Sequence, residues 1–118
     1  MSLFLPQLWD KFLDANHGDQ FWPEFNKLQN HFQECLRLFM ARPVAQRDAR
    51  ELSQLWTSTQ RWVQLEMSFD MYARGESYTL PRVPFSKTTQ QFMSYARTQD
   101  PSYCEGLMNR YWLCHQRA

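Results

Sequence analysis

The chain of 118 residues contains no isoleucine and only three valines, at positions 44, 63 and 83. Branched aliphatic residues favour β-sheets, whereas leucine, glutamine, arginine and methionine lose little rotamer freedom in a helix and are plentiful here. The near absence of branched aliphatic residues therefore predicts an all-α fold. A chain of this length has the usual size of one domain, so we predict a single α-helical domain over residues 1–118.

Glycine is also rare, because Gly18, Gly75 and Gly106 are the only ones in the chain. A phosphate-binding loop or a dinucleotide fingerprint needs several closely spaced glycines, so the sequence excludes nucleotide sites of these kinds. No apolar run approaches the roughly 18 residues of a membrane-spanning helix. The first residues also lack the basic flank and apolar stretch of a signal peptide. We therefore expect no membrane association and a cytoplasmic location.

The charge balance is close to zero, with a formal net charge of +1. Residues 1–40 carry three Lys or Arg against five Asp or Glu, and the remaining residues carry the opposite excess. So weak an asymmetry gives no strong electrostatic footprint for nucleic acid. The three cysteines are an odd number without a framework spacing, which predicts reduced thiols at Cys35, Cys104 and Cys114.

The chain is poor in branched aliphatic residues but rich in aromatic ones. The chain contains five Trp, nine Phe and five Tyr, and each ring brings a large apolar area to a core. Trp and Tyr are also enriched at protein interfaces. The surplus of rings therefore has two interpretations, a plainly aromatic core or rings that lie at the surface and await a partner.

Hydrophobic spacing predicts a small bundle of four to five helices. One short helix begins near Pro6, and a second ends at Arg42-Pro43, since the residue before a proline is disfavoured in a helix. Ser86 and Asp100-Pro101 are typical of helix starts. The second helix carries a regular apolar seam with steps of three and four residues, formed by Phe25, Leu28, Phe32, Cys35 and Phe39.

The longest stretch without proline or glycine runs from about residue 45 to residue 74 and ends just before Gly75. Its apolar stripe predicts a long central helix with one buried face, around which the other helices are arranged. If the protein associates with another copy of itself, we expect the interface on this helix. The predicted anchor residues are Trp56, Trp62, Phe69 and Tyr72.

Glu66 and Asp70 fall within the same apolar stripe, although buried carboxylates are costly unless they are paired. Three interpretations remain open: an exposed ladder that includes Arg74, ion pairs with an arginine of another helix or subunit, or a metal or acid–base pair. Bundle metal sites usually use a Glu-x-x-His motif on facing helices. The sequence contains neither Glu-x-x-His nor Glu-x-x-Glu, so we predict no metal and no cofactor.

His31 and Cys35 are four residues apart and share a helix face. With Cys114 and His115 they could supply two Cys and two His ligands for zinc, or a Cys–His pair could act as a nucleophile. The spacing matches no zinc module, and Cys35 belongs to the apolar seam, where a free cysteine behaves as a small hydrophobic residue. We predict an ordinary core cysteine, no catalytic residues and no enzymatic activity.

These observations predict a non-catalytic protein–protein interaction module whose partner is another protein, including a second copy in a homodimer. One alternative is a small-molecule pocket lined by rings, in which Glu66 or Asp70 receives a cationic group. A second alternative is weak binding of nucleic acid by arginines at 42, 47, 50 and 61, near Trp56 and Trp62. The low net charge makes nucleic acid the less favoured partner.

Overall fold

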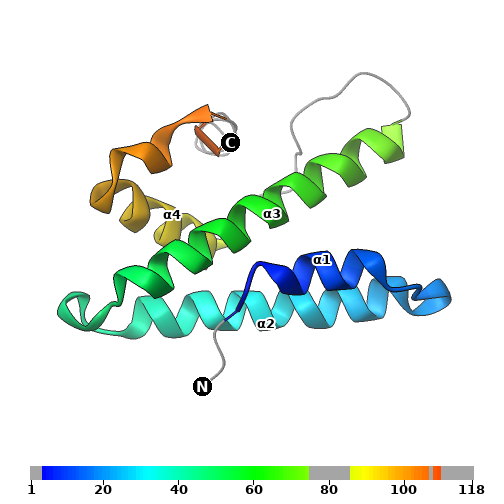
Figure 1. The fold of residues 1–118 in the computed structure, drawn as a ribbon, viewed down its shortest axis with the longest axis horizontal. Helices are drawn as coiled ribbons and strands as arrows, with labels where there is room; N and C mark the ends of the chain where they lie inside the picture. The colour runs from blue at the N-terminus through cyan, green and yellow to red at the C-terminus, as the bar shows by residue number, and fades with distance from the viewer. Residues whose placement is uncertain (1–3, 75–85, 107, 110–118) are drawn as a thin grey trace. The chain divides into compact units, whose positions relative to one another are not determined.

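The computed structural model describes residues 4–74, 86–106 and 108–109, with their side chains except those of residues 66–74 and 104. These residues form α-helices and short 3-10 helices and no β-strand, so the predicted all-α bundle is confirmed. The elements in chain order are α1 (Gln7–Asp14), η1 (Gly18–Gln20), α2 (Phe21–Ala41), η2 (Val44–Gln46), α3 (Ala49–Arg74), α4 (Lys87–Gln99) and η3 (Pro101–Cys104) (Figure 1). None of the described helices is both long enough and apolar enough to cross a membrane.

The chain divides into two compact units, Met1–Ser58 and Thr59–Ala118. The boundary falls inside α3, so the first part of this helix belongs to one unit and the rest to the other. The long central helix is therefore confirmed as the element shared by both units. That the whole chain behaves as one domain stays a prediction.

The first unit has an aromatic core between α1 and α2, which lie side by side in Figure 1. Phe4, Trp9 and Phe32 are fully buried. The ring of Phe32 meets Phe4 at 5.0 Å and Trp9 at 5.7 Å between centroids, edge to face in both cases. Such tilted pairs match the quadrupoles of the rings, so a few bulky side chains fill this space.

Trp9 also connects α1 to the part of α3 that lies in the first unit. Its indole Nε1 donates a hydrogen bond to the carbonyl oxygen of Ser58 at 3.1 Å. The Ser58 hydroxyl lies 2.9 Å from the carbonyl oxygen of Gln54 and 3.3 Å from that of Phe4. Because buried polar groups must find partners, these bonds fix the height of α1 along α3.

The predicted apolar seam of α2 is confirmed at four of its five positions. The buried seam residues are Phe25, Phe32, Cys35 and Phe39. Leu28 is only half-buried, whereas Leu36, which the seam did not include, is fully buried. The seam therefore packs in the core along most of α2, and at Leu28 it reaches the surface.

The long helix α3 begins at Ala49, four residues later than the expected residue 45. Residues 44–46 form the separate 3-10 turn η2, and Asp48 then caps α3. The backbone N–H of Arg50 donates to the Asp48 carboxylate at 2.7 Å. A capping side chain satisfies one of the unpaired N–H groups of the first turn, which fixes where the helix starts.

In the second unit, Ser86 caps α4 as its sequence predicted. Its hydroxyl oxygen accepts a hydrogen bond from the backbone N–H of Thr89 at 3.1 Å. The helix buries Phe92 and Ala96, whereas Tyr95 is half-buried. The cap satisfies an N–H group of the first turn and so fixes where α4 begins.

Asp100 begins the next element, as the sequence also predicted, and accepts a hydrogen bond from the N–H of Ser102 at 3.0 Å. Residues 101–104 form the 3-10 turn η3 rather than the first turn of an α-helix. Arg97 of α4 donates to the Asn109 side-chain oxygen at 3.1 Å, which links α4 to the chain beyond this turn. Residues 110–118, the rest of the predicted last helix, lie outside the described residues.

The structure predicts that Trp9→Phe lowers the free energy of unfolding by about 2 kcal/mol. The substitution removes the hydrogen bond to Ser58, which contributes about 1 kcal/mol, and leaves a small cavity of similar cost. Urea unfolding followed by circular dichroism measures the change. Trp22→Phe is the matched control, because Trp22 is 57% exposed and should change stability by less than about 0.5 kcal/mol. Equal losses in the two variants would contradict the assignment of Trp9 to the core.

A second prediction concerns the cap of α4. Ser86→Ala should lower stability by about 1 kcal/mol, because the Thr89 N–H loses its acceptor. Ser86→Asp should keep most of that stability, since its carboxylate can accept the same bond. Thermal unfolding of the two variants, compared with the unsubstituted chain, checks the difference. If alanine and aspartate were equivalent at this position, the cap would not contribute to stability.

Candidate functional site

Two of the four predicted interface residues are buried within the chain itself. Trp56 is 3% exposed and Trp62 is 5% exposed. A ring that is covered by its own chain has no area left to offer a partner, so burial argues against both as interface anchors. Phe69 and Tyr72, the other two, have side chains that lie outside the described residues.

Glu66 and Asp70 belong to α3, but their side chains also lie outside the described residues. The three interpretations of these carboxylates therefore stay predictions. The small-molecule pocket, in which one of these carboxylates was expected to receive a cationic group, also stays a prediction.

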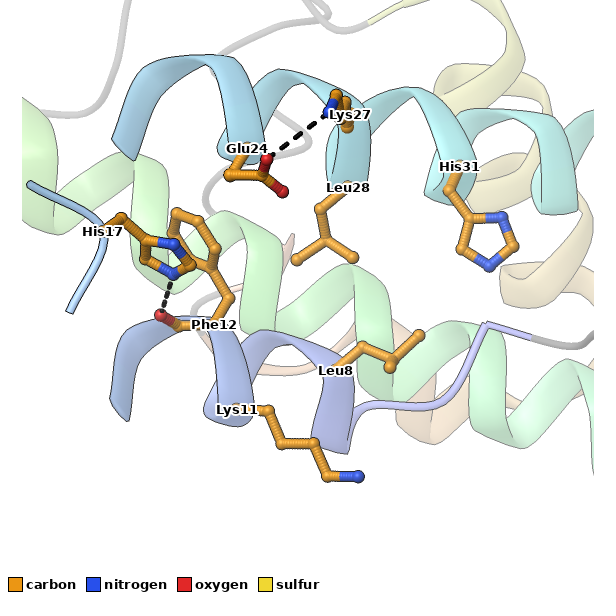
Figure 2. A pocket seen from close by; sticks show the side chains of 8 residues that line it. All are labelled: Leu8, Lys11, Phe12, His17, Glu24, Lys27, Leu28 and His31. Carbon is orange, nitrogen blue, oxygen red and sulfur yellow. Dashed lines mark hydrogen bonds and ion pairs between the residues drawn. The ribbon is translucent and has the colours of Figure 1, made fainter. Parts of the chain in front are cut away.

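The structure shows a different candidate site, a surface groove of about 380 Å³ between α1 and α2. Figure 2 shows Leu8 on α1 and Leu28 on α2, whose side chains extend into the space between the helices, with Phe12 beside them. These three residues give the groove its apolar floor. The groove is open to solvent along one side, so its charged residues form a rim. The polar lining residues are Lys11, His17, Glu24, Lys27 and His31.

The lining residues occupy one face of each helix, since residues three and four apart are neighbours on a helix surface. They are Leu8, Lys11 and Phe12 on α1, and Glu24, Lys27, Leu28 and His31 on α2. The sequence analysis assigned Leu28 to the apolar seam of the second helix and did not predict the groove. The signal that could have shown it is the polar neighbours, because Lys11 and His31 directly flank apolar stripe residues that a closed core would shield.

His17 fixes the end of the groove where α1 turns toward α2. Its Nε2 donates a hydrogen bond to the carbonyl oxygen of Phe12 at 2.9 Å, and its ring stacks on that of Phe12 at 4.4 Å. Gly18 follows with a φ of +52°, in the left-handed region that glycine adopts without strain. The turn at His17 and Gly18, which follows α1, therefore shapes one end of the groove.

The two lysines on the rim differ in how far other residues of the chain neutralise their charge. Lys27 lies 3.4 Å from Glu24, but the two side chains are 76% and 42% exposed, and such pairs contribute little. Lys11 is exposed, and no described residue pairs with its ammonium group. The rim therefore has cationic groups on both helices and a single carboxylate.

Trp22 lies at the same end of the α1–α2 hairpin as His17 and is 57% exposed. Its ring meets Phe21 at 5.0 Å, and Phe21 meets the groove residue Phe12 at the same distance. A continuous series of ring contacts therefore links the groove residue Phe12 to Trp22. On α2, Trp22 precedes the groove residue Glu24 by two residues, about 200° around the helix, and therefore lies on the face opposite the groove.

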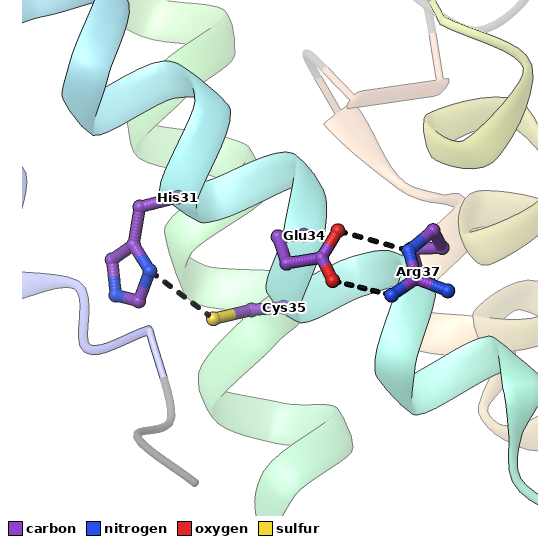
Figure 3. A network of polar contacts seen from close by, with 4 residues as sticks. All are labelled: His31, Glu34, Cys35 and Arg37. Atoms are coloured by element: carbon purple, nitrogen blue, oxygen red, sulfur yellow. Dashed lines mark hydrogen bonds and ion pairs between the residues drawn. The ribbon is translucent and has the colours of Figure 1, made fainter.

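His31 and Cys35 are close together, as their spacing predicted, with 3.9 Å between Nδ1 and Sγ (Figure 3). Cys35 is a buried free cysteine, and burial raises the pKa of its thiol, because a thiolate would lose its hydration. A nucleophilic cysteine needs a lowered pKa, so the geometry does not favour that role. Figure 3 also shows Glu34 beside Arg37, whose hydrogen bond lowers the pKa of that exposed carboxyl.

The zinc hypothesis finds no support in the part of the chain that the structure describes. No group of three or more potential ligands comes together there. Cys114 and His115, the other two members of the hypothetical set, lie outside the described residues.

Two of the four arginines proposed for nucleic acid are used within the chain. Arg42 forms an ion pair with Glu51, which raises the pKa of the guanidinium. Arg47 donates to the carbonyl oxygens of Met40 at 2.9 Å and Arg42 at 3.2 Å, and lies over the ring of Phe39. These bonds satisfy carbonyl groups at the end of α2. Nucleic-acid binding stays a prediction that the geometry of these two residues does not favour.

No protein-family model matches this chain, and no curated protein or solved structure is similar enough to count as a match. The proposal that follows therefore depends on the geometry of the groove alone.

The raised pKa of Cys35 predicts a pH dependence of stability. In the unfolded chain the thiol ionises near its usual value of 9.0, whereas in the folded chain it stays protonated to higher pH. The thiol contribution is therefore complete below about pH 9 and is lost as the pH rises above it. Urea unfolding between pH 7 and 10.5 should show a steeper loss for the natural chain than for Cys35→Ala.

The rate of alkylation provides a second measurement of the same thiol. At pH 8, iodoacetamide should modify Cys35 more slowly in the folded chain than in urea, as measured on its peptide by mass spectrometry. A folded chain that reacts as fast as the unfolded one would mean that Cys35 is an accessible, activated thiol.

Proposed function

We propose that this chain is a non-catalytic protein-binding module that holds a segment of another protein in the groove between α1 and α2. The observation that carries the proposal is an open groove between α1 and α2 with an apolar floor. Covering Leu8 and Leu28 would remove apolar surface from water, which is the main driving force of most protein association.

The form of the groove favours a protein segment over a small molecule. Small-molecule sites enclose most of the surface of their ligand, with about 70–90% of it buried. This groove is open along one side, so a small molecule in it would stay partly in contact with water. A segment of protein can lie along the groove and extend beyond it, so that it also makes contacts outside the groove.

The groove is also held in place before any partner arrives. The hydrogen bond between Trp9 and Ser58 and the packing of Phe32 against Trp9 fix α1, and the bond from His17 fixes the end of that helix. A preformed surface loses less conformational entropy on binding, so more of the favourable contact energy appears as affinity. The rigidity of the first unit therefore supports a binding role.

A second copy of this chain is one candidate partner, as the sequence suggested. Light scattering over a tenfold range of concentration would reveal it as a rising mass. The buried rings of Trp56 and Trp62 offer no surface to such a copy, so we place its binding surface on the groove between α1 and α2.

Affinity selection of a random peptide library on the immobilised full chain tests the proposal. We expect enriched peptides that bind the natural chain at least about tenfold more tightly than Leu8→Gln/Leu28→Gln, since a buried leucine contributes about 1.5–3 kcal/mol. The matched control is Leu5→Gln/Leu13→Gln, because these leucines are 42% and 49% exposed and do not line the groove.

Circular dichroism establishes that both double variants remain folded before binding is compared. Selected peptides that bind the groove variant and the control variant equally would contradict the proposed site. A selection that yields no binding peptide would contradict the proposed function itself.

A further inference from the structure

We propose that the segment held in the groove is an acidic amphipathic helix. This inference rests on the proposed function and adds the chemistry of the partner. It follows from three properties of the described residues: the distribution of charge around the groove, the placement of cations on both rims, and the absence of a β-strand edge among them.

The charge around the groove is opposite in sign to the charge of the segment that contains it. Residues 1–40 carry three Lys or Arg and five Asp or Glu. Two of these cations, Lys11 and Lys27, line the groove, whereas Glu24 is the only one of the five carboxylates that does. Asp10 follows Leu8 by two residues, about 200° around the helix, and therefore lies on the opposite face of α1. The cations are concentrated where a partner would bind.

The two lysines lie on opposite sides of the apolar floor. Lys11 extends from α1 and Lys27 from α2, as Figure 2 shows, with Leu8 and Leu28 between them. Lys27 forms only an exposed ion pair with Glu24, so a carboxylate of a bound partner can compete for its ammonium group. A partner with an apolar ridge and a row of carboxylates on each flank would match this pattern of charge.

The occupant should be helical because the described residues offer no strand edge. An extended segment laid on the floor would leave some of its backbone N–H and C=O groups without partners. A helix satisfies these groups internally and presents apolar residues at spacings of three and four, as in other helix-in-groove complexes. Since α1 is about 12 Å long, the groove would receive about two turns of the partner helix.

Three synthetic peptides of about 18 residues test this inference on the full chain. The first has leucines at helical spacing and glutamates on both flanks, the second replaces the glutamates with lysines, and the third replaces the leucines with glutamines. We expect the first to bind at least about tenfold more tightly than either of the others, as measured by fluorescence anisotropy. Raising the salt concentration from 0.05 to 0.5 M should weaken its binding, because exposed charges are screened.

Variants of the rim identify the residues that receive the carboxylates. Lys11→Glu/Lys27→Glu should weaken binding of the acidic peptide about tenfold or more. Arg50→Glu/Lys87→Glu is the matched control, because both residues are exposed, neither lines the groove, and the net charge changes equally. This control should stay within about twofold of the natural chain. If Lys11→Glu/Lys27→Glu fails to fold, Lys11→Gln/Lys27→Gln replaces it, with a smaller loss expected.

Equal binding of the acidic and basic peptides, or equal losses in the rim and control variants, would overturn the inference. Tight binding of the peptide without leucines would also overturn it, because the surface would then bind charge alone, as a nucleic acid could supply. If library selection yields groove-dependent peptides that are not acidic helices, the inference fails and the proposed function stands. If selection yields no such peptides, the proposed function fails as well.

Discussion

Trp9 is the residue on which the first unit depends, because its fully buried ring also donates a hydrogen bond to another helix. Its ring packs against Phe4, Phe25 and Phe32, and its N–H reaches the carbonyl oxygen of Ser58. Apolar contact is not directional, so packing specifies the position of a helix less sharply than a hydrogen bond does. The bond from Trp9 to Ser58, together with the bond from the Ser58 hydroxyl to Phe4, fixes the position of α1 along α3.

That position leaves part of α1 uncovered. With Trp9 and Phe12 buried, Leu8 and Lys11 must face the side where α2 presents Leu28 and Lys27. A short helix that lies beside a long one leaves a groove along its flank unless a further element fills it. In the described part of the first unit no such element lies there, and the result is an apolar floor with a cationic rim.

Sequence patterns predicted the elements better than they predicted the site. The caps at Ser86 and Asp100 were predictable because a capping residue acts on N–H groups only two or three positions away. The seam of α2 was predictable because helical periodicity is also local. The start of α3 was predicted four residues early, because the prediction used the absence of proline and glycine and did not use the local cap signal of Asp48 followed by Glu51. Trp56 and Trp62 were placed at an interface, because a tryptophan has the same appearance in a sequence whether it is buried or exposed.

The sequence by itself determined the fold class and the two caps that begin α4 and η3, because these depend on propensity and on hydrogen bonds between near neighbours. The abundance of rings left two interpretations open, an aromatic core or rings at the surface, and the structure buries Phe4, Trp9 and Phe32 in the core. Only the tertiary structure decided which apolar residues remain at the surface. Leu8 and Leu28 belong to the same stripes as the core residues, and the groove exists because two separate helices leave the space between them partly filled. Such a space depends on the distance between residues far apart in the chain, which no local pattern specifies.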